Sequence, residues 1–358
     1  MKDAKNLDNL RDKIDAIDSE LIALLDKRTE VVLEVGKTKE KTNAEFYAPD
    51  RERAVYRRIE ELSKGLFPKK ALRSIYREIM SASLSLEKPL RIAFLGPNAT
   101  FTHLASMKHF GLSGEFIPKE EISSVFNDVE RGKAEYGVVP IESTAEGVVN
   151  HTLDMFINSE LKISAEILLE ATTLLLNKSG NIKDIEKVCS NPHAIAQCVQ
   201  WLKINMPNIP IVEVVSTATA AEMAKNDPSV GAVASEAAAT FYDLKIVEDT
   251  IQDNPYNMTR FLVIGKKEST KTGADKTSLM FAIKDSPGAL YKFLKPFASR
   301  GINLTKIESR PLKQKAWEYV FFLDIDGHKS EENISDAIGE LDEMASFMKV
   351  LGSYTKSK

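Results

Sequence analysis

Basic side chains interrupt an apolar pattern near the start of the chain. Residues 24–39 read LLDKRTEVVLEVGKTK, and apolar rows with heptad spacing run through them, which predicts a long helix. Arg28 takes a place in one row, whose other members are Leu7, Ile14, Leu21 and Val35. Taking a guanidinium out of water costs on the order of several kcal/mol unless anions meet it. We therefore expect either a protein carboxylate or an anionic ligand at Arg28.

Further cations surround this position. Lys39 follows Arg28 by eleven residues, about three turns, so both side chains point the same way. Arg11 precedes Arg28 by seventeen residues, roughly 100° off that face, and fits another site such as a partner's. Two further predicted helices contribute Arg51, Glu52, Ser83 and Glu87. Several cations with few acids suit a small dicarboxylate, because arginine binds carboxylates with two parallel hydrogen bonds.

Two simpler interpretations of these cations remain open from spacing alone. Arg28 fits a buried polar residue that sets the register of a coiled coil. Lys39 and Arg51 fit solvated surface charges, and the helical region as a whole fits a dimerisation arm.

Residues 1–87 are predicted to be helical. The first helix is about 32 residues, or roughly 48 Å, long. A domain of this size cannot cover such a helix alone, which predicts that two copies pack together. A second helix begins after Pro49 and ends at Gly65, and a third, over residues 69–87, stops before Pro89.

The rest of the chain shows two other patterns of predicted secondary structure. Short apolar strands alternate with helical patterns up to residue 265, which is typical of an α/β domain with a largely parallel sheet. The strands are LRIAFLG, YGVVPIES, IEKVCS, IPIVEVVS, VGAVAS and TRFLVIG. Residues 266–276 read as a polar linker. Residues 277–355 follow the order βαββαβ, which predicts a ferredoxin-like domain.

Composition excludes several classes of function. The 358 residues are too many for one ordinary core, and a net charge of −4 gives no reason to expect nucleic acid. The charged start of the chain does not resemble a signal peptide, and no apolar run approaches a membrane span. Two cysteines, Cys189 and Cys198, cannot form a disulfide framework or a four-thiolate metal site. We expect a cytoplasmic protein with no metal and no cofactor.

The α/β and C-terminal regions carry weaker local signals. Thr259 begins a strand after a polar loop, where a side chain can face a cleft, although a β-branched residue also simply favours a strand. GPNATF is consistent with an anion-binding turn before a helix. DSPGAL and IESRP are, by themselves, compatible with ordinary turn chemistry.

The order of these motifs resembles a known family. LRDKIDAIDSELIALLDKRTEVVLEVGKTK followed by DRER resembles the all-helical chorismate mutase domain. GPNATFTHLA, YGVVPIESTAEGVVNHTLD, CSNPHAIAQC and NMTRF resemble prephenate dehydratase. The whole chain is similar to bifunctional chorismate mutase–prephenate dehydratases with a C-terminal ACT regulatory domain. The resemblance implies a multidomain protein with an all-α mutase domain (1–88), a two-lobed α/β dehydratase domain (89–267) and an α+β ferredoxin-like ACT domain (277–355).

The resemblance implies roles for the mutase residues. Lys39 and Glu87 would donate hydrogen bonds to the breaking ether oxygen of chorismate. Arg11 from a partner chain, Arg28 and Arg51 would hold the two carboxylates. The remaining substrate-binding positions are Glu52 and Ser83. Some relatives carry an aspartate at the place of Ala48 that contacts the substrate hydroxyl, so Glu52 would make that contact alone.

For the dehydratase, the resemblance implies that Thr259 protonates the leaving hydroxyl of prephenate, with phenylpyruvate as the product. The other substrate-binding positions carried over from the family are Ser190, Gln197, Arg260 and Phe261. This sequence departs from the usual residues of the family at Ala99, Ser143, Asn191 and His193, where relatives have Gly, Asn, His and Gln. Ser143 removes an amide from the cleft.

For the ACT domain, the resemblance implies feedback inhibition by L-phenylalanine bound between paired copies. The positions carried over are Gly288, Ala289, Leu290, Glu308, Ser309 and Arg310. The expected partners are therefore chorismate, prephenate, L-phenylalanine and further copies of this chain, as a homodimer or a higher homo-oligomer. A two-lobed α/β domain also resembles solute-binding receptors, but the missing signal peptide argues against that class.

Overall fold

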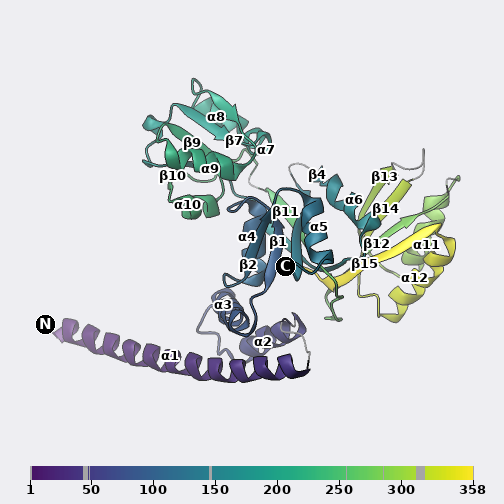
Figure 1. Ribbon diagram of the computed structural model, residues 1–358, viewed down its shortest axis with the longest axis horizontal. Coiled ribbons are helices and arrows are strands. Elements are labelled where there is room, and N and C mark those ends of the chain that lie inside the picture. The colour runs from purple at the N-terminus through teal and green to yellow at the C-terminus, as the bar shows by residue number, and fades with distance from the viewer. Residues whose placement is uncertain are drawn as a thin grey trace. The chain divides into compact units, whose positions relative to one another are not determined.

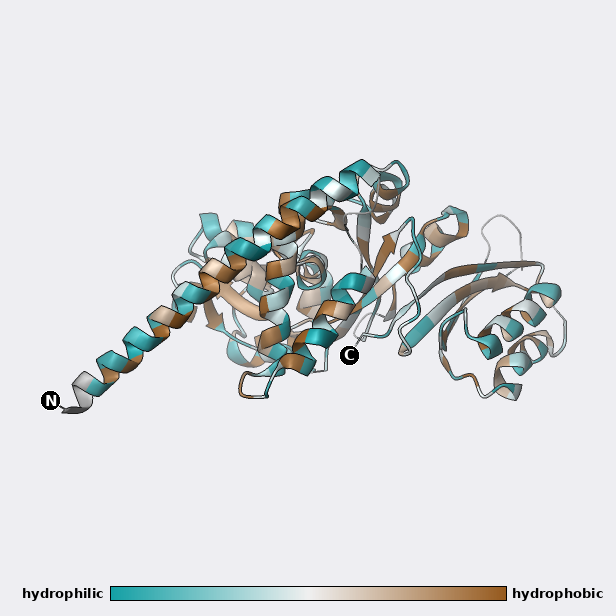
Figure 2. Cartoon of the chain, turned by 90° about the horizontal axis from the view of Figure 1, so that it is seen from below, coloured by the Kyte–Doolittle hydropathy of each residue, from teal (hydrophilic) through white to brown (hydrophobic). Residues whose placement is uncertain are grey.

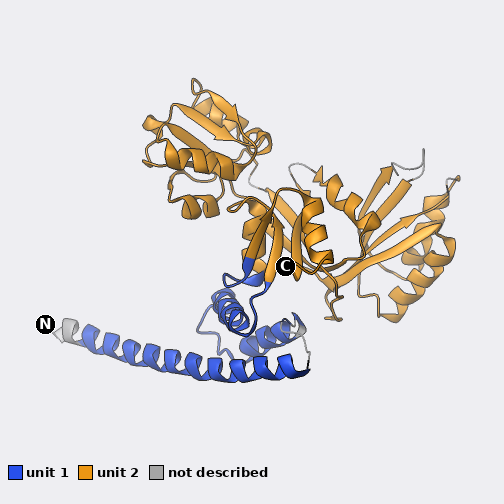
Figure 3. Ribbon diagram, in the orientation of Figure 1, with its two compact units in different colours: residues 1–90, 110–115 blue, residues 91–109, 116–358 orange. Residues whose placement is uncertain are grey.

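The computed structural model describes residues 2–357 except 43–46, 48, 145–146, 255, 285 and 312–318. Figure 1 shows the elements in order along the chain. The chain divides into two compact units, coloured in Figure 3. The first comprises residues 1–90 and 110–115, and the second comprises residues 91–109 and 116–358. Ala48, the departure noted in the mutase motif, lies outside the described residues.

Three helices form the first unit: α1 (Lys2–Thr42), α2 (Pro49–Leu62) and α3 (Lys69–Glu87). Helices α2 and α3 lie where the sequence predicts them. At 41 residues, α1 is longer than predicted. It begins at Lys2 because neither glycine nor proline interrupts the residues before the first apolar position.

The apolar rows of α1 are largely uncovered within one chain. Figure 2 shows hydrophobic residues recurring along this helix. Their side chains are 43–60% exposed at Leu7, Leu10, Ile14, Ile17, Leu21, Leu24, Val31 and Val35. Such a face has the form expected of a packing surface rather than of a solvated helix.

Gly36 brings α1 and α3 together. A Cβ at this position would lie 3.1 Å from Cγ of Glu87, and Gly36 itself is buried. A side chain at this position would therefore crowd Glu87 where it meets Lys39, and the Glu87 side chain would have to give by a few tenths of an ångström.

The second unit contains two mixed sheets before residue 266. The first has the order β2-β1-β3-β11-β5, with β4 paired to β3. Strand β1 runs parallel to β3, whereas β11 is antiparallel to both β3 and β5. The strands are β1 (Arg91–Leu95), β2 (Glu115–Lys119), β3 (Tyr136–Ser143), β4 (Gly147–Val148), β5 (Lys162–Glu170) and β11 (Met258–Gly265). Their helices are α4 (Phe101–Phe110), α5 (Ile122–Glu130) and α6 (Asn150–Asn158).

The second sheet has the order β10-β6-β9-β7-β8. Strand β7 is parallel to β8 and β9, but β6 is antiparallel to β9 and β10. Its strands are β6 (Leu174–Asn177), β7 (Lys187–Ser190), β8 (Ile211–Glu213), β9 (Val230–Ala234) and β10 (Lys245–Glu248). The helical segments are η1 (Ile182–Asp184), α7 (Pro192–Ala196), α8 (Val199–Asn205), α9 (Thr217–Asn226) and α10 (Glu236–Tyr242).

The predicted α/β character is confirmed, but the prediction of a largely parallel sheet is wrong. Strands β5 and β6 follow one another without an intervening helix. The chain therefore leaves one sheet and enters the next directly, and it returns through β11, which runs against both of its neighbours. Only parallel neighbouring strands need a crossover helix between them. Strands β5 and β6 are not such a pair, and they therefore have no helical pattern between them in the sequence.

The C-terminal region is a four-stranded sheet with two helices. Its order, β13-β14-β12-β15, is that of a ferredoxin-like fold. The elements are β12 (Asp275–Ala282), α11 (Ala289–Ser299), β13 (Leu304–Pro311), β14 (Tyr319–Asp326), α12 (Glu332–Met344) and β15 (Phe347–Thr355). The predicted βαββαβ order is confirmed.

One hydrophobic core joins this sheet to the first sheet of the second unit. Side chains of β12, β14 and β15, among them Met280, Phe322 and Leu351, are buried in the same cluster as Ile163 and Leu262. Gly352 makes the approach possible, because a Cβ there would lie 2.3 Å from the backbone oxygen of Ile163. The C-terminal sheet is thus packed on the dehydratase-like sheet rather than tethered to it.

Among the described residues, none of the helices is both long and apolar enough to span a lipid bilayer.

Candidate active sites and effector region

A cavity of about 470 Å³ opens among the three helices of the first unit. Charged and polar residues predicted from the sequence line it: Arg28, Lys39, Arg51, Glu52, Ser83 and Glu87. Apolar groups complete the walls, with Val31, Val32, Val35, Val55, Met80 and Leu84 among them. The cavity therefore combines an apolar surface with convergent charge, which is the composition of a small-molecule site.

Arg28, in the middle of an apolar row, meets a polar partner of its own chain. Its Nη1 donates a hydrogen bond to the hydroxyl of Ser83 on α3, and that hydroxyl donates to the carbonyl oxygen of Ile79 at 2.6 Å. Neither partner is a carboxylate. The guanidinium is thus held in place by a neutral group, and its charge remains directed at the cavity.

Lys39 and Glu87 form the second polar pair of the cavity. Their Nζ and Oε2 atoms are 2.9 Å apart, and the Glu87 side chain is only 8% exposed. Glu87 belongs to the last turn of α3, and Gly36 allows this turn to approach α1. An ammonium and a carboxyl group are thereby presented side by side to the same space.

Glu52 is held by two tyrosines that the sequence did not single out. Tyr56 Oη donates to Glu52 Oε1 at 3.1 Å, one helical turn further along α2. Burial raises the pKa of Glu52, and the hydrogen bonds from Tyr56 and Tyr47 oppose that rise. The (i, i+4) spacing of Glu52 and Tyr56 was visible in the sequence, whereas Tyr47 precedes the helix and gave no periodic signal.

Arg11 does not line the cavity. Seventeen residues of α1 separate it from Arg28, a distance of about 26 Å along a helix. Its side chain is 66% exposed and pairs with Asp8 at 3.4 Å. The other sequence-predicted residues of this unit come together without it.

Thr259 lies near the start of β11 in the second unit. In the register of the sheet it stands opposite Ser143 of β3 on one side and Leu169 of β5 on the other. Ser143, one of the positions where this sequence departs from the family pattern, is therefore the direct neighbour of Thr259. The pairing of β11 with β3 shifts between Arg260 and Phe261, an irregularity of the kind that re-aims side chains beside active sites.

Gln197 joins Thr259's strand to the second sheet. Asn257, two residues before Thr259, donates through Nδ2 to Gln197 Oε1 at 2.7 Å and to the carbonyl oxygen of Ala171 at 3.1 Å. Asn257 is only 4% exposed, and its Oδ1 is a buried atom without a hydrogen-bond partner. Gln197 and Thr259 are thus brought to the same end of β11.

The turn before α4 also reaches the second sheet. Ala99 has φ +64°, a left-handed conformation that costs a non-glycine residue about 1–2 kcal/mol, which accounts for the usual glycine of the family at this place. Its carbonyl oxygen accepts a hydrogen bond from Ser235 Oγ at 3.2 Å. His103 Nδ1 accepts from the Ala99 N–H at 3.0 Å, and burial lowers the pKa of His103. The imidazole is therefore neutral and structural.

Three of the residues carried over for this domain are buried. Ser190 is fully buried and donates to the carbonyl oxygen of Val233 at 2.6 Å, so it holds β7 to β9. Phe261 is 1% exposed and packed in the sheet. Arg260 points to the face of β11 opposite Thr259, since successive side chains of a strand alternate.

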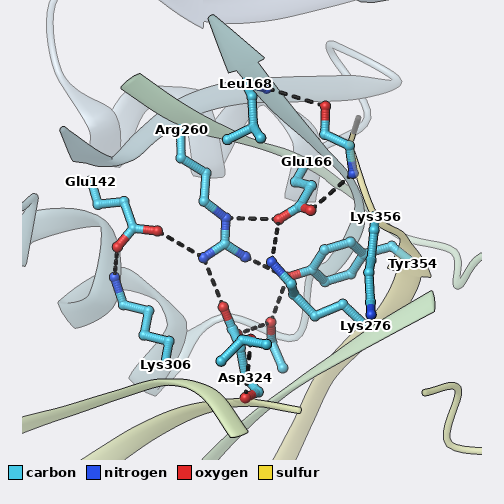
Figure 4. Close-up of polar contacts among 12 residues, drawn as sticks. Glu142, Glu166, Leu168, Arg260, Lys276, Lys306, Asp324, Tyr354 and Lys356 are labelled. Carbon is cyan, nitrogen blue, oxygen red and sulfur yellow. Dashed lines mark hydrogen bonds and ion pairs between the residues drawn. The ribbon is translucent and has the colours of Figure 1, made fainter. Parts of the chain in front are cut away.

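Arg260 is instead the centre of a buried ionic network, drawn in Figure 4. Its Nε donates to Glu166 at 2.8 Å, its Nη1 to Glu142 at 3.0 Å and to Asp324 at 2.7 Å, and its Nη2 to Tyr354 Oη at 2.9 Å. Asp324 and Tyr354 belong to the C-terminal sheet, on β14 and β15. Four of the five N–H groups of the guanidinium are thus engaged within the protein.

Two lysines balance the charge of this network. Lys276 donates to Glu166 at 2.9 Å, and Lys306 pairs with Glu142. Burial opposes the charge of Arg260, but the surrounding Tyr354, Asp324 and Glu166 outweigh it and raise the pKa of the guanidinium. Burial also acts on Glu142, yet Lys306 and Arg260 prevail and lower its pKa. Arg260 and Glu142 are therefore charged, whereas burial raises the pKa of Tyr354 and keeps its hydroxyl neutral.

The predicted effector residues fall into two places in the C-terminal domain. Gly288, with φ +76°, caps α11, and Ala289 lines a cavity of about 530 Å³ with Lys284, Lys292 and Glu343. Leu290 packs against the domain core. Glu308, Ser309 and Arg310 lie instead on β13, the edge strand. Arg310 is paired through Nη2 with both oxygens of Asp154 on α6, at 3.0 and 3.2 Å.

Within the described residues, His, Cys, Asp and Glu side chains form no cluster of three or more suited to a metal ion. Cys189 and Cys198 are buried free thiols.

A helical unit with a cationic cavity, a two-lobed α/β domain and a ferredoxin-like domain packed on it define a multidomain enzyme acting on small anionic molecules. Family comparisons agree. Chorismate mutase type II matches residues 10–88, prephenate dehydratase matches 92–269, and the ACT domain matches 277–343. The chain is 51% identical over 357 residues to the bifunctional chorismate mutase/prephenate dehydratase of Aquifex aeolicus, covering 99% of each chain. This chain belongs to the family of bifunctional chorismate mutase/prephenate dehydratases.

Solved structures resemble the second unit. Prephenate dehydratase from Arthrobacter aurescens, determined in complex with L-Phe, is 35% identical with a TM-score of 0.69 and covers 75% of this chain and 90% of its own. GqqA, described as a quorum-quenching acylase, is 27% identical with a TM-score of 0.68, covering 75% of this chain and 98% of its own. The fold of the second unit therefore does not fix an activity by itself.

Proposed function

We propose that the helical unit rearranges chorismate to prephenate, and that the α/β domain converts prephenate to phenylpyruvate under feedback inhibition by L-phenylalanine. The observation that carries the proposal is the cavity in which Arg28, Lys39 and Glu87 converge, in a chain whose three family matches follow one another in order. The expected location is the cytoplasm, in keeping with the two free thiols.

The rearrangement of chorismate needs neither a nucleophile nor a proton transfer. Catalysis then consists of holding the reactive conformer and stabilising the charge that develops on the ether oxygen. Arg28 and Arg51 are placed to bind carboxylates, and Lys39 is placed to donate to the oxygen. Glu87 lies beside Lys39 and donates to the same oxygen when it is protonated. Glu52 is left for the substrate hydroxyl.

The second reaction removes carbon dioxide and water from prephenate. The electrons of the breaking carboxylate bond move into the ring, and the ring hydroxyl leaves with a proton, so that the ring becomes aromatic. Hydroxide is a poor leaving group, and a donor must stand beside it. Thr259 takes this role, next to Ser143 and at the end of β11 where Gln197 is held.

The proposed mutase site would be completed by a second chain. Arg11 is about 26 Å from Arg28 along α1, and the apolar rows around it are exposed. A second copy, packed along α1 with two-fold symmetry, would cover these rows and carry its Arg11 to the neighbouring cavity. We therefore infer a homodimer, or a higher oligomer built on it, in which each mutase site contains residues of both chains.

The network around Arg260 supports a route for the inhibition. Arg260 follows Thr259 directly, and Glu142 precedes Ser143. Both charged groups are bound from the C-terminal sheet, Arg260 by Asp324 and Glu142 by Lys306. Lys306 lies on β13, two residues before the effector position Glu308. A shift of β13 on binding phenylalanine would thus act on the two strands that carry Thr259 and Ser143.

The two activities should separate by mutation. Arg28→Ala should lose mutase turnover by about a hundredfold or more, because a charged hydrogen bond to the substrate is lost, and should keep dehydratase activity on supplied prephenate. Thr259→Ala should do the reverse. Each variant is the control for the other, and both reactions are followed spectrophotometrically. Mutase turnover of Arg28→Ala within about threefold of the wild type would remove Arg28 from the site.

Arg11 should act across the dimer. Arg11→Ala and Lys39→Ala chains, each inactive as a mutase, are mixed in equal amounts, unfolded and refolded together. Half of the dimers then contain both chains, with one intact site out of two, so mutase activity should return to about a quarter of the wild-type value. Thr259→Ala mixed with Lys39→Ala provides the positive control. Mixed dimers without recovered activity would place Arg11 in the site of its own chain.

Mutase activity should survive the replacement of Glu87 by glutamine but not by alanine. The glutamine amide donates a hydrogen bond and can serve the ether oxygen, whereas alanine offers no donor. The measurement is kcat for chorismate, with Glu60→Gln, on the neighbouring helix α2, as the control. An equal loss of turnover in Glu87→Gln and Glu87→Ala would assign Glu87 to the Lys39 ion pair alone.

Lys306→Met should uncouple inhibition from phenylalanine binding. Basal dehydratase turnover should stay within about twofold of the wild-type value, and calorimetry should still detect the binding of phenylalanine. The phenylalanine concentration needed for half-inhibition should rise about tenfold or more. Arg300→Met is the matched control, because Arg300 pairs with Glu340 inside the same domain at 2.9 Å. Unchanged inhibition, or loss of phenylalanine binding itself, would overturn the proposed role of Lys306.

A further inference from the structure

A short segment beyond the three helices forms part of the first unit. Residues 110–115 group with residues 1–90, as Figure 3 shows, although the chorismate mutase match ends at residue 88 and residues 92–269 match prephenate dehydratase. The segment begins at Phe110, the last residue of α4, and ends at the start of β2. By sequence it belongs to the dehydratase, and by its contacts it belongs to the mutase.

Backbone hydrogen bonds hold this segment on α3. The N–H of Leu112 donates to Glu78 Oε2 at 2.9 Å, and the N–H of Ser113 donates to Ser81 Oγ at 3.1 Å. Gly111 adopts φ +76°, and a Cβ there would lie 2.4 Å from Cβ of Ser81. Only glycine satisfies both the backbone conformation and the close approach, so the contact with α3 is built into the sequence.

The contact places an aromatic ring in the mutase cavity. Phe110 is 7% exposed and lines the cavity together with Tyr47. The two ring centroids are 5.8 Å apart with planes inclined at 55°, an arrangement that aromatic pairs favour. Tyr47 hydrogen-bonds Glu52. Phe110 therefore contacts Tyr47, which orients Glu52, one of the predicted substrate-binding residues.

The same segment positions a further cation. Glu78, which accepts from the N–H of Leu112, also accepts from Nε of Arg77 at 2.8 Å. Arg77 lines the cavity, as does Ser81, the partner of Ser113. Without residues 110–115, this wall of the cavity would be exposed to water. Glu78, which orients Arg77, would also lose its hydrogen bond from the N–H of Leu112.

We propose that Phe110 is a substrate-positioning residue of the mutase, with its ring packed against the unsaturated ring of chorismate. This inference rests on the proposed mutase function. Chorismate has an apolar ring between its charged substituents, and the cations of the cavity bind only the latter. An aromatic wall restricts the ring to the compact conformer that reacts, and it excludes water from the site, which strengthens the action of Arg28 and Lys39 on the substrate. Arg77, oriented through Glu78, adds positive charge to the same wall.

The test is Phe110→Ala in the full chain, with Leu112→Ala as the matched control. Leu112 lies in the same segment, but its side chain is 65% exposed and does not line the cavity. Phe110→Ala should lower kcat/KM for chorismate by about tenfold or more, with kcat itself reduced, since orientation is lost in the transition state. Dehydratase activity on supplied prephenate should stay within about twofold, and Leu112→Ala should leave both activities unchanged.

A second variant moves the ring without removing it. Gly111→Ala forces the segment away from Ser81 and should reduce mutase activity in the same direction, even if Phe110→Ala does not fold. Thermal melting of each variant establishes that α1 to α3 remain folded. Mutase kinetics like the wild type in folded Phe110→Ala, or an equal loss in Leu112→Ala, would overturn the role of Phe110. A wild-type chain without mutase activity would instead overturn the proposed function itself.

Discussion

The second unit depends on one buried guanidinium. Arg260 joins three strands of the dehydratase sheet to two strands of the ACT sheet. Three carboxylates surround it, and two lysines offset the excess negative charge of those carboxylates. A buried ion pair adds little stability against an apolar replacement, but removing one partner leaves charges that cost about 3–5 kcal/mol. The network therefore fixes how the two sheets face one another more than it strengthens their contact, because only one docking satisfies every group.

Periodicity predicted the three helices of the first unit and the elements of the C-terminal domain, but it missed the strands β2, β4, β5, β6 and β10 and the assembly of the sheets. The βαββαβ order follows from residues 277–355 alone because each helix and strand there has its own pattern. The mixed sheets could not be foreseen in the same way. Strand β11 inserts between β3 and β5 although 87 residues separate the end of β5 from its start, and the pairing is decided by which apolar faces meet. The local sequence indicates which face of a strand is apolar, but it does not indicate which strand lies next to it.

The same limit bears on the candidate site residues. Arg28 and Lys39 could be singled out because a cation on an apolar helical face has few explanations, and the structure places Ser83 and Glu87 opposite them on α3. Arg260 adjoins Thr259 in sequence, whereas alternation along a strand sends its side chain to the other face. The sequence did not single out Phe110, because a phenylalanine at the end of an apolar helix usually belongs to the protein core. Its place in the cavity becomes evident only when the structure shows α3 beside it.

The two catalytic regions differ in what completes them. The dehydratase region and its regulatory sheet share one core within a single chain. The mutase cavity draws on α1 to α3 and on residues 110–115, and the apolar rows of α1 are exposed within one chain. Gly36 and Gly111 allow α3 to lie close to α1 and to residues 110–115, because a Cβ at either position would crowd a side chain of α3. In the proposed homodimer a second copy would cover the exposed rows, so mutase activity would depend on protein concentration in a way that the α/β fold does not.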